Sequence, residues 1–500
     1  MHPRHHAQQQ PDKPAFIMAA SGHVVTYAEL EDQANRIAQL YRTLGLKNGD
    51  HIAVMLANEA LYLPVVWAAQ RSGLVFTCIS THLNDDDAQY ILNDCKASAL
   101  VTSSTYAKRL GDTSATILLV DADDQGSSDL RYLMDQHPAE PIADEQAGVD
   151  MLYSSGTTGR PKGVAVQLDG AGIEEMLPVM KGLAQLYGID GDTVYLSTAP
   201  LYHAAPLRFN MLVMSMGGTC VIMDRFDGET ALSLIEQHRI THSQWVPIMF
   251  SRMLKAGLRE SNTCNLASHR VAIHAAAPCP PDVKQAMIDW WGPILNEYYS
   301  STEGIGFTAI DSRQWLQHPG SVGRAVVGEI RIVGEDGGAL PVGEPGQVFF
   351  AGGPAFHYFG DEEKTAEATN AEGWYTVGDI GYTDEEGFLY LTDRQSFMII
   401  SGGVNIYPQE IESVLITHPG VSDVAVFGVP SEQFGEEVKA VVEPAPGCAS
   451  EAELRDTLMA FCRERLSGIK CPRSIDFDDA LPRLPNGKLY KKQLRARYWS

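Results

Sequence analysis

The alternation of helical and strand-like segments in the first hundred residues constrains the fold most. Thr26 and Glu29 have the spacing of a capping box, and apolar residues then recur at helical intervals up to Gly45, which suits a helix C-terminus. The apolar run 51–56 is typical of a buried strand, and a second helical stretch covers 60–72. Strands that alternate with helices predict a parallel sheet in an α/β domain.

The last hundred residues repeat this alternation on a smaller scale. A helix is expected over 408–416, and strands are expected over 421–429 and 437–442. Ser450 and Glu453 form a second capping box, which predicts a further helix. This part of the chain has enough apolar residues for a core of its own.

The length of the chain predicts several domains, because 500 residues exceed what one hydrophobic core usually organises. Between the two alternating blocks, polar and glycine residues are most concentrated in the stretch 393–403. We therefore predict an α/β protein with a large N-terminal domain (1–393), built from several subdomains with parallel sheets flanked by helices. A hinge region (394–403) and a small, mobile α+β C-terminal domain (404–500) would follow.

Composition argues against several classes of partner. The chain carries 38 Lys and Arg against 63 Asp and Glu, a formal net charge of −25, and such a surface repels nucleic acid. No run approaches the roughly 20 apolar residues of a membrane span, and the first residues lack a signal-peptide pattern. Eight cysteines without a CxxC pair are typical of a reduced, cytoplasmic protein. No HExxH spacing occurs, so a metal held by protein ligands alone is not expected.

The segment 153–163 is the sharpest chemical signal. Glycines let backbone N–H groups face an anion, hydroxyls add donors and cations add charge, which together suit a polyphosphate. The spacing is not that of a Walker A loop, and composition alone leaves a flexible surface loop as the alternative. The residues expected to contact ATP here are Ser154, Ser155, Gly156, Thr157, Thr158, Gly159 and Lys162.

This segment resembles the phosphate-binding signature of the acyl-adenylate-forming superfamily, which includes acyl-CoA synthetases, 4-coumarate–CoA ligases, luciferases and peptide-synthetase adenylation domains. Four further motifs of that family occur in the family's order, and together they span about residue 10 to 494. The resemblance implies an AMP-forming acyl-CoA synthetase of the fatty-acid–CoA or 4-coumarate–CoA ligase type. It also implies ATP and CoA as cosubstrates and Mg²⁺ as the cofactor.

The segment 298–304 resembles the family's aromatic-x-x-Thr-Glu motif. The resemblance implies that Tyr299 stacks on adenine, Thr302 contacts phosphate and Glu303 holds Mg²⁺. A carboxylate suits that role, because Mg²⁺ usually takes one or two carboxylates plus substrate phosphates. Without the resemblance, the segment would be an ordinary acidic loop after a strand.

Three further motifs complete the nucleotide site that the resemblance implies. Asp379, in the segment 373–379, resembles the ribose-binding aspartate, and Arg394 resembles the arginine that touches ribose or phosphate. Lys488 resembles the lysine of the C-terminal loop that reaches the carboxylate and the α-phosphate during adenylation. A cation there would stabilise oxygens that otherwise repel each other in the transition state.

The region after Arg394 resembles the family's hinge and CoA path. Ser396 occupies the hinge position, where many relatives carry Lys or Asp. Ser401, Gly402 and Gly403 would line the narrow path of the CoA pantetheine arm, where a Cβ atom would block close approach.

The residues that would surround the carboxylic acid follow less closely from the motifs than the nucleotide site does. Tyr202, His203 and Ala204 resemble the segment that walls the carboxylic acid, and no Asp near His203 is placed to bind an amino-acid ammonium group. Apolar and small residues at the other wall positions favour a hydrophobic acid, whether fatty, alicyclic or aromatic. Those positions are Trp245, Met249, Ala276 and Gly304, and core packing is the alternative for the first two.

The expected catalytic residues are therefore Lys488, Thr302, Glu303 and His203. One alternative is an acyl-AMP ligase that loads a carrier protein, or an oxidative enzyme of the luciferase kind. A second is a nucleotide-binding relative without catalysis, which the presence of all the motif residues disfavours. We expect a carboxylic acid, ATP and CoA as partners, with no nucleic acid and no membrane span, and homodimerisation stays open.

Overall fold

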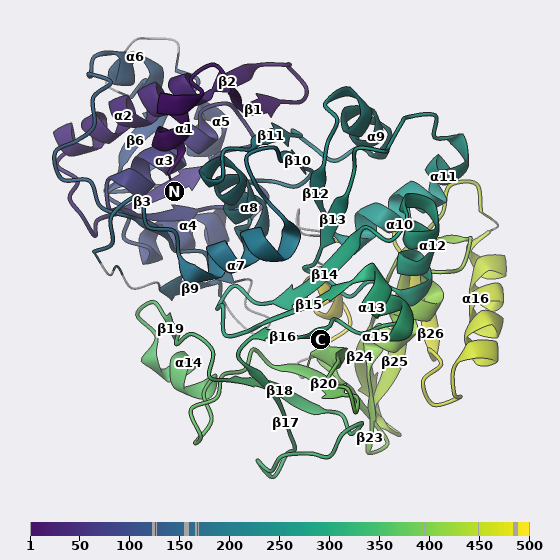
Figure 1. Cartoon of the computed structure of the whole chain (residues 1–500). Coiled ribbons are helices and arrows are strands. Elements are labelled where there is room, and N and C mark those ends of the chain that lie inside the picture. Colours follow the sequence, from purple (N-terminus) through teal and green to yellow (C-terminus); the bar gives the residue numbers. More distant parts are fainter. Residues whose placement is uncertain are drawn as a thin grey trace. The chain divides into compact units, whose positions relative to one another are not determined.

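The structure is a computed structural model of the whole chain (Figure 1). It describes residues 2–122, 126, 128–154, 160–165, 168, 170–394, 397–448, 450–483 and 489–499. The described residues form two compact units: the first comprises Met1–Gln244, Cys264–Ala272 and Phe356–Glu362, and the second comprises Trp245–Thr263, Ile273–Ala355 and Glu363–Ser500. None of the described helices combines the length and apolar character needed to cross a membrane.

One sheet of the first unit has five strands in the order β6-β5-β3-β4-β7, all of them parallel. All residues of β4 and β5 are buried, as in parallel sheets covered on both faces. The strands are β3 (His51–Met55), β4 (Val75–Cys78), β5 (Ala99–Thr102), β6 (Thr116–Leu119) and β7 (Val149–Asp150). The helices within this stretch are α3 (Tyr62–Arg71), α4 (Asp85–Asp94), α5 (Ser104–Ala107) and α6 (Leu130–Asp135).

A second parallel arrangement in the first unit follows the order β12-β10-β11-β1, with β2 antiparallel at its edge. The strands are β1 (Pro14–Met18), β2 (Val24–Thr26), β10 (Val194–Ser197), β11 (Thr219–Ile222) and β12 (His242–Trp245). The helices are α1 (Pro3–Gln9), α2 (Tyr27–Thr43), α7 (Pro178–Tyr187), α8 (Ala204–Ser215) and α9 (Gly228–Gln237). Short strands β8 (Tyr153–Ser154), β9 (Lys162–Ala165) and β19 (His357–Tyr358) form a small separate sheet.

The second unit contains two antiparallel arrangements before residue 395. One consists of β14 (Leu295–Ser300), β15 (Phe307–Asp311) and β16 (Arg324–Val327). The other has the order β17-β18-β20-β21, with β17 (Glu329–Val333), β18 (Gly346–Ala351), β20 (Asp379–Thr383) and β21 (Leu389–Arg394). The helices are α10 (Pro247–Lys255), α11 (Leu258–Ser261), α12 (Pro281–Trp291), α13 (Ser312–Gln317) and α14 (Glu362–Glu367). The strand β13 (Val271–His274) begins in the first unit and ends in the second.

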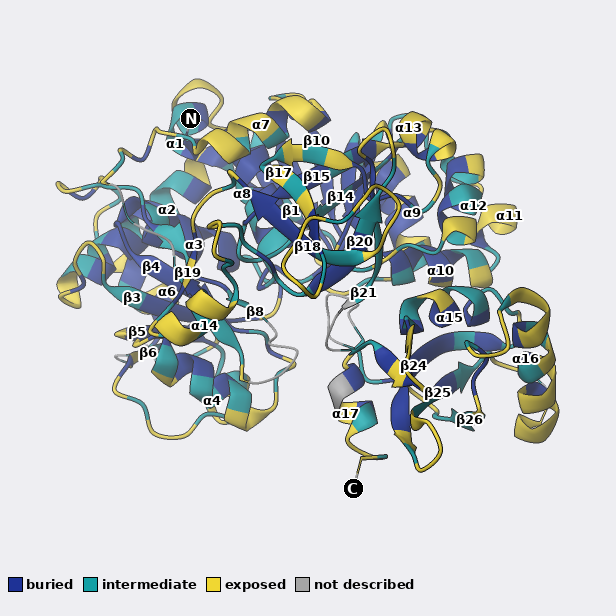
Figure 2. Ribbon diagram, turned by 90° about the horizontal axis from the view of Figure 1, so that it is seen from below, coloured by how far each residue is buried: buried dark blue, intermediate teal, exposed yellow. Residues whose placement is uncertain are grey.

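From β22 onward the second unit has a sheet and a core of its own, as the sequence predicted. The sheet has the order β23-β22-β25-β24, with β26 beside β25. Figure 2 shows β24 and β25 largely buried and much of α16 exposed. The boundaries 393 and 404 stay predictions. The elements are β22 (Ile399–Ser401), β23 (Val404–Ile406), α15 (Pro408–Leu415), β24 (Val421–Ser431), β25 (Gly435–Pro444), α16 (Glu451–Arg465), β26 (Ser474–Phe477) and α17 (Lys491–Arg495).

Both predicted capping boxes are present. Thr26 and Glu29 cap α2, and Ser450 and Glu453 cap α16, with reciprocal side-chain and backbone hydrogen bonds in each case. The predicted strands 51–56, 421–429 and 437–442 correspond to β3, β24 and β25, and the structure extends the last two. On α16 the buried stripe is Leu454, Leu458 and Cys462, while Phe461 is only partly buried.

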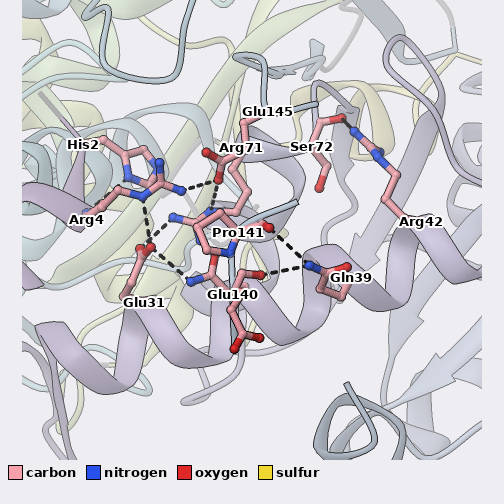
Figure 3. A network of polar contacts seen from close by, with 11 residues as sticks. His2, Arg4, Glu31, Gln39, Arg42, Arg71, Ser72, Glu140, Pro141 and Glu145 are labelled. Carbon is pink, nitrogen blue, oxygen red and sulfur yellow. Dashed lines mark hydrogen bonds and ion pairs between the residues drawn. The ribbon is translucent and has the colours of Figure 1, made fainter. Parts of the chain in front are cut away.

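Arg71 is the centre of an ion-pair network in the first unit (Figure 3). Its side chain is wholly buried, and its Nη2 lies 2.6 Å from Glu31 Oε2 and its Nε 3.7 Å from Glu145 Oε1. Arg71 also donates to Asn35, and Arg4 of α1 contacts both Glu31 and Glu145. Because Glu31 and Asn35 belong to α2 and Arg71 ends α3, the network joins α1, α2 and α3.

Replacing Arg71 by Met should lower the free energy of unfolding by about 3–5 kcal/mol, because Glu31 and Glu145 would lose their buried cation. A matched control is Arg497→Met, since the half-exposed Arg497 pairs with Asp478, at 2.6 Å. That change should cost about 0–1 kcal/mol. Urea unfolding of the full chain measures both values, and equal losses would contradict the role given to Arg71.

Candidate active site

The turn that joins β14 to β15 carries the predicted phosphate and magnesium residues. Gly304 N donates to Ser301 O at 3.1 Å, and Gly304 adopts a φ of +67°, which closes the turn tightly. Thr302 and Glu303 lie within it and are half-buried. Ser301 Oγ is buried and has no hydrogen-bond partner among the residues that the structure describes. The turn therefore holds a hydroxyl that a bound ligand can satisfy.

Asp379 begins β20 and is only 6% exposed. The phenol of Tyr299, on β14, donates to Asp379 Oδ2 at 2.5 Å. Thr376 fixes the segment just before β20, because its Oγ1 donates to Val348 O at 2.8 Å and accepts from Gly378 N at 3.1 Å. The predicted adenine and ribose residues are thus in direct contact, and the carboxylate of Asp379 is held in one orientation.

The backbone of Arg394 completes this group. In the antiparallel pairing of β20 with β21, Asp379 lies directly opposite Arg394. Three motifs that are far apart in the sequence, represented by Tyr299, Asp379 and Arg394, therefore come together within the second unit. This arrangement has the elements a mononucleotide requires, namely an aromatic ring, a carboxylate for sugar hydroxyls and a cationic residue.

The ends of the predicted phosphate loop pair with each other. Ser154 on β8 lies opposite Lys162 on β9, and Lys162 Nζ lies 4.7 Å from the centroid of the Tyr358 ring. The other predicted phosphate contacts fall outside the described residues: Ser155, Gly156, Thr157, Thr158 and Gly159. Lys488 and the hinge residue Ser396 also lie outside them.

In the first unit, the residues predicted to contact the carboxylic acid follow the carboxyl end of β10. His203 is the N-cap residue of α8, and Ala204 is the first residue of that helix. Because the first N–H groups of a helix lack partners within it, this end of α8 favours an anion such as a carboxylate. Tyr202 is buried and packs edge-on against His203, with ring centroids 4.7 Å apart. Burial raises the pKa of Tyr202 to about 12, so its phenol stays protonated near neutral pH.

In the second unit, the residues predicted to contact the carboxylic acid differ in burial. Trp245 is 1% exposed and packs on Trp291, at a centroid distance of 5.1 Å, and Met249 is also buried. These contacts agree with core packing, which the sequence left as the alternative. Ala276 is exposed and has a φ of +76°, a strained conformation for alanine of the kind that gathers at ligand sites. Its place in the acyl pocket stays a prediction.

Gly402 and Gly403 form the turn between β22 and β23. Their φ values are +57° and +82°, and Ser401 pairs with Val404 across the turn, so this is a two-residue hairpin that favours glycine at both positions. A Cβ on Gly403 would meet no atom of the chain within 4 Å. The turn conformation therefore explains the glycines without a close approach inside the protein, and the CoA path stays a prediction.

Sequence reasoning missed two residues that support the acid segment. Asn58 is buried, and its side chain accepts from Leu201 N at 2.8 Å and donates to Met223 O at 2.7 Å. His82 Nδ1 lies 2.9 Å from Tyr202 Oη. Both residues follow the carboxyl ends of parallel strands, β3 and β4, where α/β proteins commonly place ligand sites. That position is the signal that identifies them.

Comparison with known proteins agrees with this geometry. Residues 3–357 match the family model of AMP-binding enzymes, and residues 410–488 match the model of the AMP-binding enzyme C-terminal domain. The chain belongs to the AMP-binding enzymes.

Relatives and solved structures of this family resemble the chain over nearly its whole length. A feruloyl-CoA synthase of an Amycolatopsis species is 33% identical over 97% of this chain and 96% of the relative. A long-chain-fatty-acid–CoA ligase of Mycobacterium tuberculosis is 31% identical over 99% of this chain and 97% of the relative. The structure of o-succinylbenzoate CoA synthetase from Bacillus subtilis with an acyl-adenylate intermediate has a TM-score of 0.82 and 29% identity, and covers 99% of this chain and 97% of its own.

These findings confirm the acyl-adenylate-forming superfamily that the motifs predicted. They also confirm the α/β fold with a large N-terminal and a smaller C-terminal domain. The reaction class is that of an AMP-forming acid–thiol ligase.

In this AMP-binding enzyme, Tyr299→Phe should raise the KM for ATP by about 10- to 100-fold. The ring that would stack on adenine remains, but Asp379 loses a hydrogen bond, and such bonds to charged groups contribute about 1.5–3 kcal/mol. Tyr382→Phe on β20 is the matched control, since Tyr382 stacks on Tyr390 instead, at a centroid distance of 5.0 Å. Steady-state kinetics measures both variants, and a rise in the KM for the acid alone would contradict the assignment.

Proposed function

We propose that the protein is an acyl-CoA synthetase that converts a hydrophobic carboxylic acid, ATP and CoA into acyl-CoA, AMP and pyrophosphate. The observation that supports the nucleotide site most is the meeting of Tyr299, Asp379 and Arg394. The reaction would run in the cytoplasm, as the cysteine content suggests.

A hydrophobic acid suits the residues of the acid segment. The carboxylate would approach His203 and the N-terminus of α8, whose backbone N–H groups favour an anion. The rest of the acid would meet apolar or small side chains, such as Ala204 and Ala276. A relative that makes feruloyl-CoA and another that acts on long-chain fatty acids keep aryl and fatty acids as the two leading classes.

In the first half-reaction, a carboxylate oxygen of the acid attacks the α-phosphorus of ATP and pyrophosphate leaves, giving the acyl-adenylate. Thr302 and the loop from Ser154 to Lys162 would bind phosphate oxygens. Lys488 would bring a positive charge to the carboxylate and the α-phosphate, which stabilises the charge of the transition state. Asp379 would accept hydrogen bonds from the ribose hydroxyls and so hold the nucleotide in place.

The residues present fit a Mg²⁺ ion. Glu303 supplies a carboxylate, and the same turn holds the hydroxyl of Ser301, which has no hydrogen-bond partner among the described residues. No group of three or more His, Cys, Asp or Glu could hold a metal alone within the described part of the chain, which suits an ion that takes its other ligands from substrate phosphates. When bound, Mg²⁺ would neutralise negative charge on those phosphates.

In the second half-reaction, the CoA sulfur attacks the acyl carbon, the bond from that carbon to the AMP oxygen breaks, and AMP leaves. Ser401, Gly402 and Gly403 would border the pantetheine arm. The C-terminal domain would turn about Ser396 between the half-reactions, which moves Lys488 away and brings the Gly402–Gly403 turn in. An acyl carrier protein in place of CoA is the alternative, and CoA-dependent AMP release separates the two.

The proposed function is tested by measuring pyrophosphate release over acids from acetate to long-chain and aryl acids, with and without CoA. We expect release with hydrophobic acids, and AMP release that depends on free CoA. Activity with acetate alone, or with an α-amino acid, would contradict the proposed substrate class.

Lys488→Ala should slow adenylation by a factor on the order of 10²–10³, as is typical when one transition-state stabiliser is removed. Thioester formation from pre-made acyl-adenylate should be spared, because the lysine would serve only the first step. Lys470→Ala, which removes an ion pair with Glu410 at 2.7 Å, is the control. Separate assays of the two half-reactions decide, and equal loss in both would reject the assignment.

Glu303→Gln should raise the Mg²⁺ concentration needed for half-maximal adenylation, because the amide keeps the shape of the side chain but loses its charge. The rise should be at least the roughly tenfold that the loss of an outer-shell metal partner costs. Glu329→Gln, at an exposed position of the same unit, is the control. An unchanged Mg²⁺ dependence in Glu303→Gln would mean that another group binds the ion.

A further inference from the structure

His82 and Tyr202 join two loops of the first unit that come from different sheets. His82 follows β4 of the five-stranded sheet, and Tyr202 follows β10 of the other sheet. The imidazole Nδ1 of His82 lies 2.9 Å from the phenol oxygen of Tyr202. His82 is exposed while Tyr202 is 4% exposed, so the contact links a surface side chain to a buried one.

The backbone around His82 is held on both sides by one arginine. Arg109 donates through Nη1 to Thr81 O at 2.5 Å and through Nη2 to Leu83 O. Its Nε also bonds Asp85 in the first turn of α4, at 2.8 Å. An exposed histidine on an unrestrained loop would lose much of a hydrogen bond to chain entropy. Arg109 removes most of this entropy loss from the contact, because it already fixes the residues before and after His82.

The backbone just before Tyr202 is held by Asn58. The buried side chain of Asn58 accepts from Leu201 N at 2.8 Å and donates to Ala199 O at 3.3 Å and Met223 O at 2.7 Å. The contact therefore connects two loops whose backbones are each fixed independently. Thr81 Oγ1 lies 3.2 Å from the same His82 Nδ1, farther than the 2.9 Å of the Tyr202 phenol oxygen.

We propose that His82 is a positioning residue of the acid site: its Nδ1 accepts from the phenol of Tyr202 and fixes the ring that packs against His203. The proposal rests on the proposed function, in which Tyr202 and His203 border the acid. With Nδ1 as the acceptor, the imidazole carries its proton on Nε2. The protonated phenol of Tyr202, with a pKa of about 12, supplies the donor.

The role of His82 is tested by the variants His82→Ala and Tyr202→Phe and by their combination. Each single change should lower kcat/KM for the acid by about three- to tenfold, the usual size of one neutral hydrogen bond, and leave the KM for ATP unchanged. Because both changes break the same bond, the double variant should lose no more than Tyr202→Phe alone.

Two further variants separate positioning from a general structural effect. His82→Asn should recover most of the activity, because the asparagine Oδ1 falls near the position of Nδ1 and can accept from the phenol. His23→Ala, at another exposed histidine of the first unit, should change neither parameter. Thermal unfolding of all variants shows whether lost stability accounts for any lost activity.

The outcomes distinguish this proposal from the proposed function. A wild-type protein without acid-dependent pyrophosphate release would overturn the proposed function and the role of His82 with it. An active wild type in which the losses of the two single variants add, or in which the KM for ATP rises equally, would overturn the role of His82 alone. Failure of His82→Asn to recover activity would also count against it.

Discussion

The buried carboxylate of Asp379 is the constraint on which the nucleotide end of the site depends. A carboxylate removed from water is costly unless it is hydrogen-bonded, and the partner here is the phenol of Tyr299, at 2.5 Å. That bond joins β14 to β20, and in the pairing of β20 with β21 the backbone of Arg394 lies opposite the backbone of Asp379. One hydrogen bond and one strand pairing thus bring three motifs to one place, and Asp379 is the residue expected to bind the ribose hydroxyls.

Local signals in the sequence predicted much of the fold. The helices α2 and α16 begin at capping boxes, and the strands β3, β24 and β25 are apolar runs, so both kinds of element follow from neighbouring residues. The contact of Tyr299 with Asp379 could not be predicted in this way, because the two residues lie on strands of different sheets, β14 and β20, and meet only through their side chains. The supporting roles of His82 and Asn58 were missed because only their position after the strands β4 and β3 indicates them, and their partners lie more than a hundred residues away in the sequence.

At some predicted positions the structure shows a physical reason for the residue that the motif did not supply. Gly402 and Gly403 were expected to be glycine because of a close approach by CoA, whereas their positive φ values in a hairpin already favour glycine. Trp245 was expected to wall the acid, and it packs within an aromatic cluster of the second unit that includes Trp291. Motif resemblance identifies a position, but the physical cause at that position comes only from its surroundings.

The link between Asp393 and α15 limits how the proposed hinge can work. Tyr407, the N-cap residue of α15, provides no side-chain cap, and Gln409 N instead donates to Asp393 Oδ2 at 2.9 Å. Asp393 precedes the proposed pivot Ser396 and α15 follows it. A rotation about Ser396 therefore either breaks this bond or has to move Asp393 together with α15. A capping bond contributes about 0.5–2 kcal/mol, which corresponds to a bias of roughly 2- to 30-fold between two poses. A bond of this strength would favour one pose, and it would still be weak enough to break in each cycle of the proposed rotation.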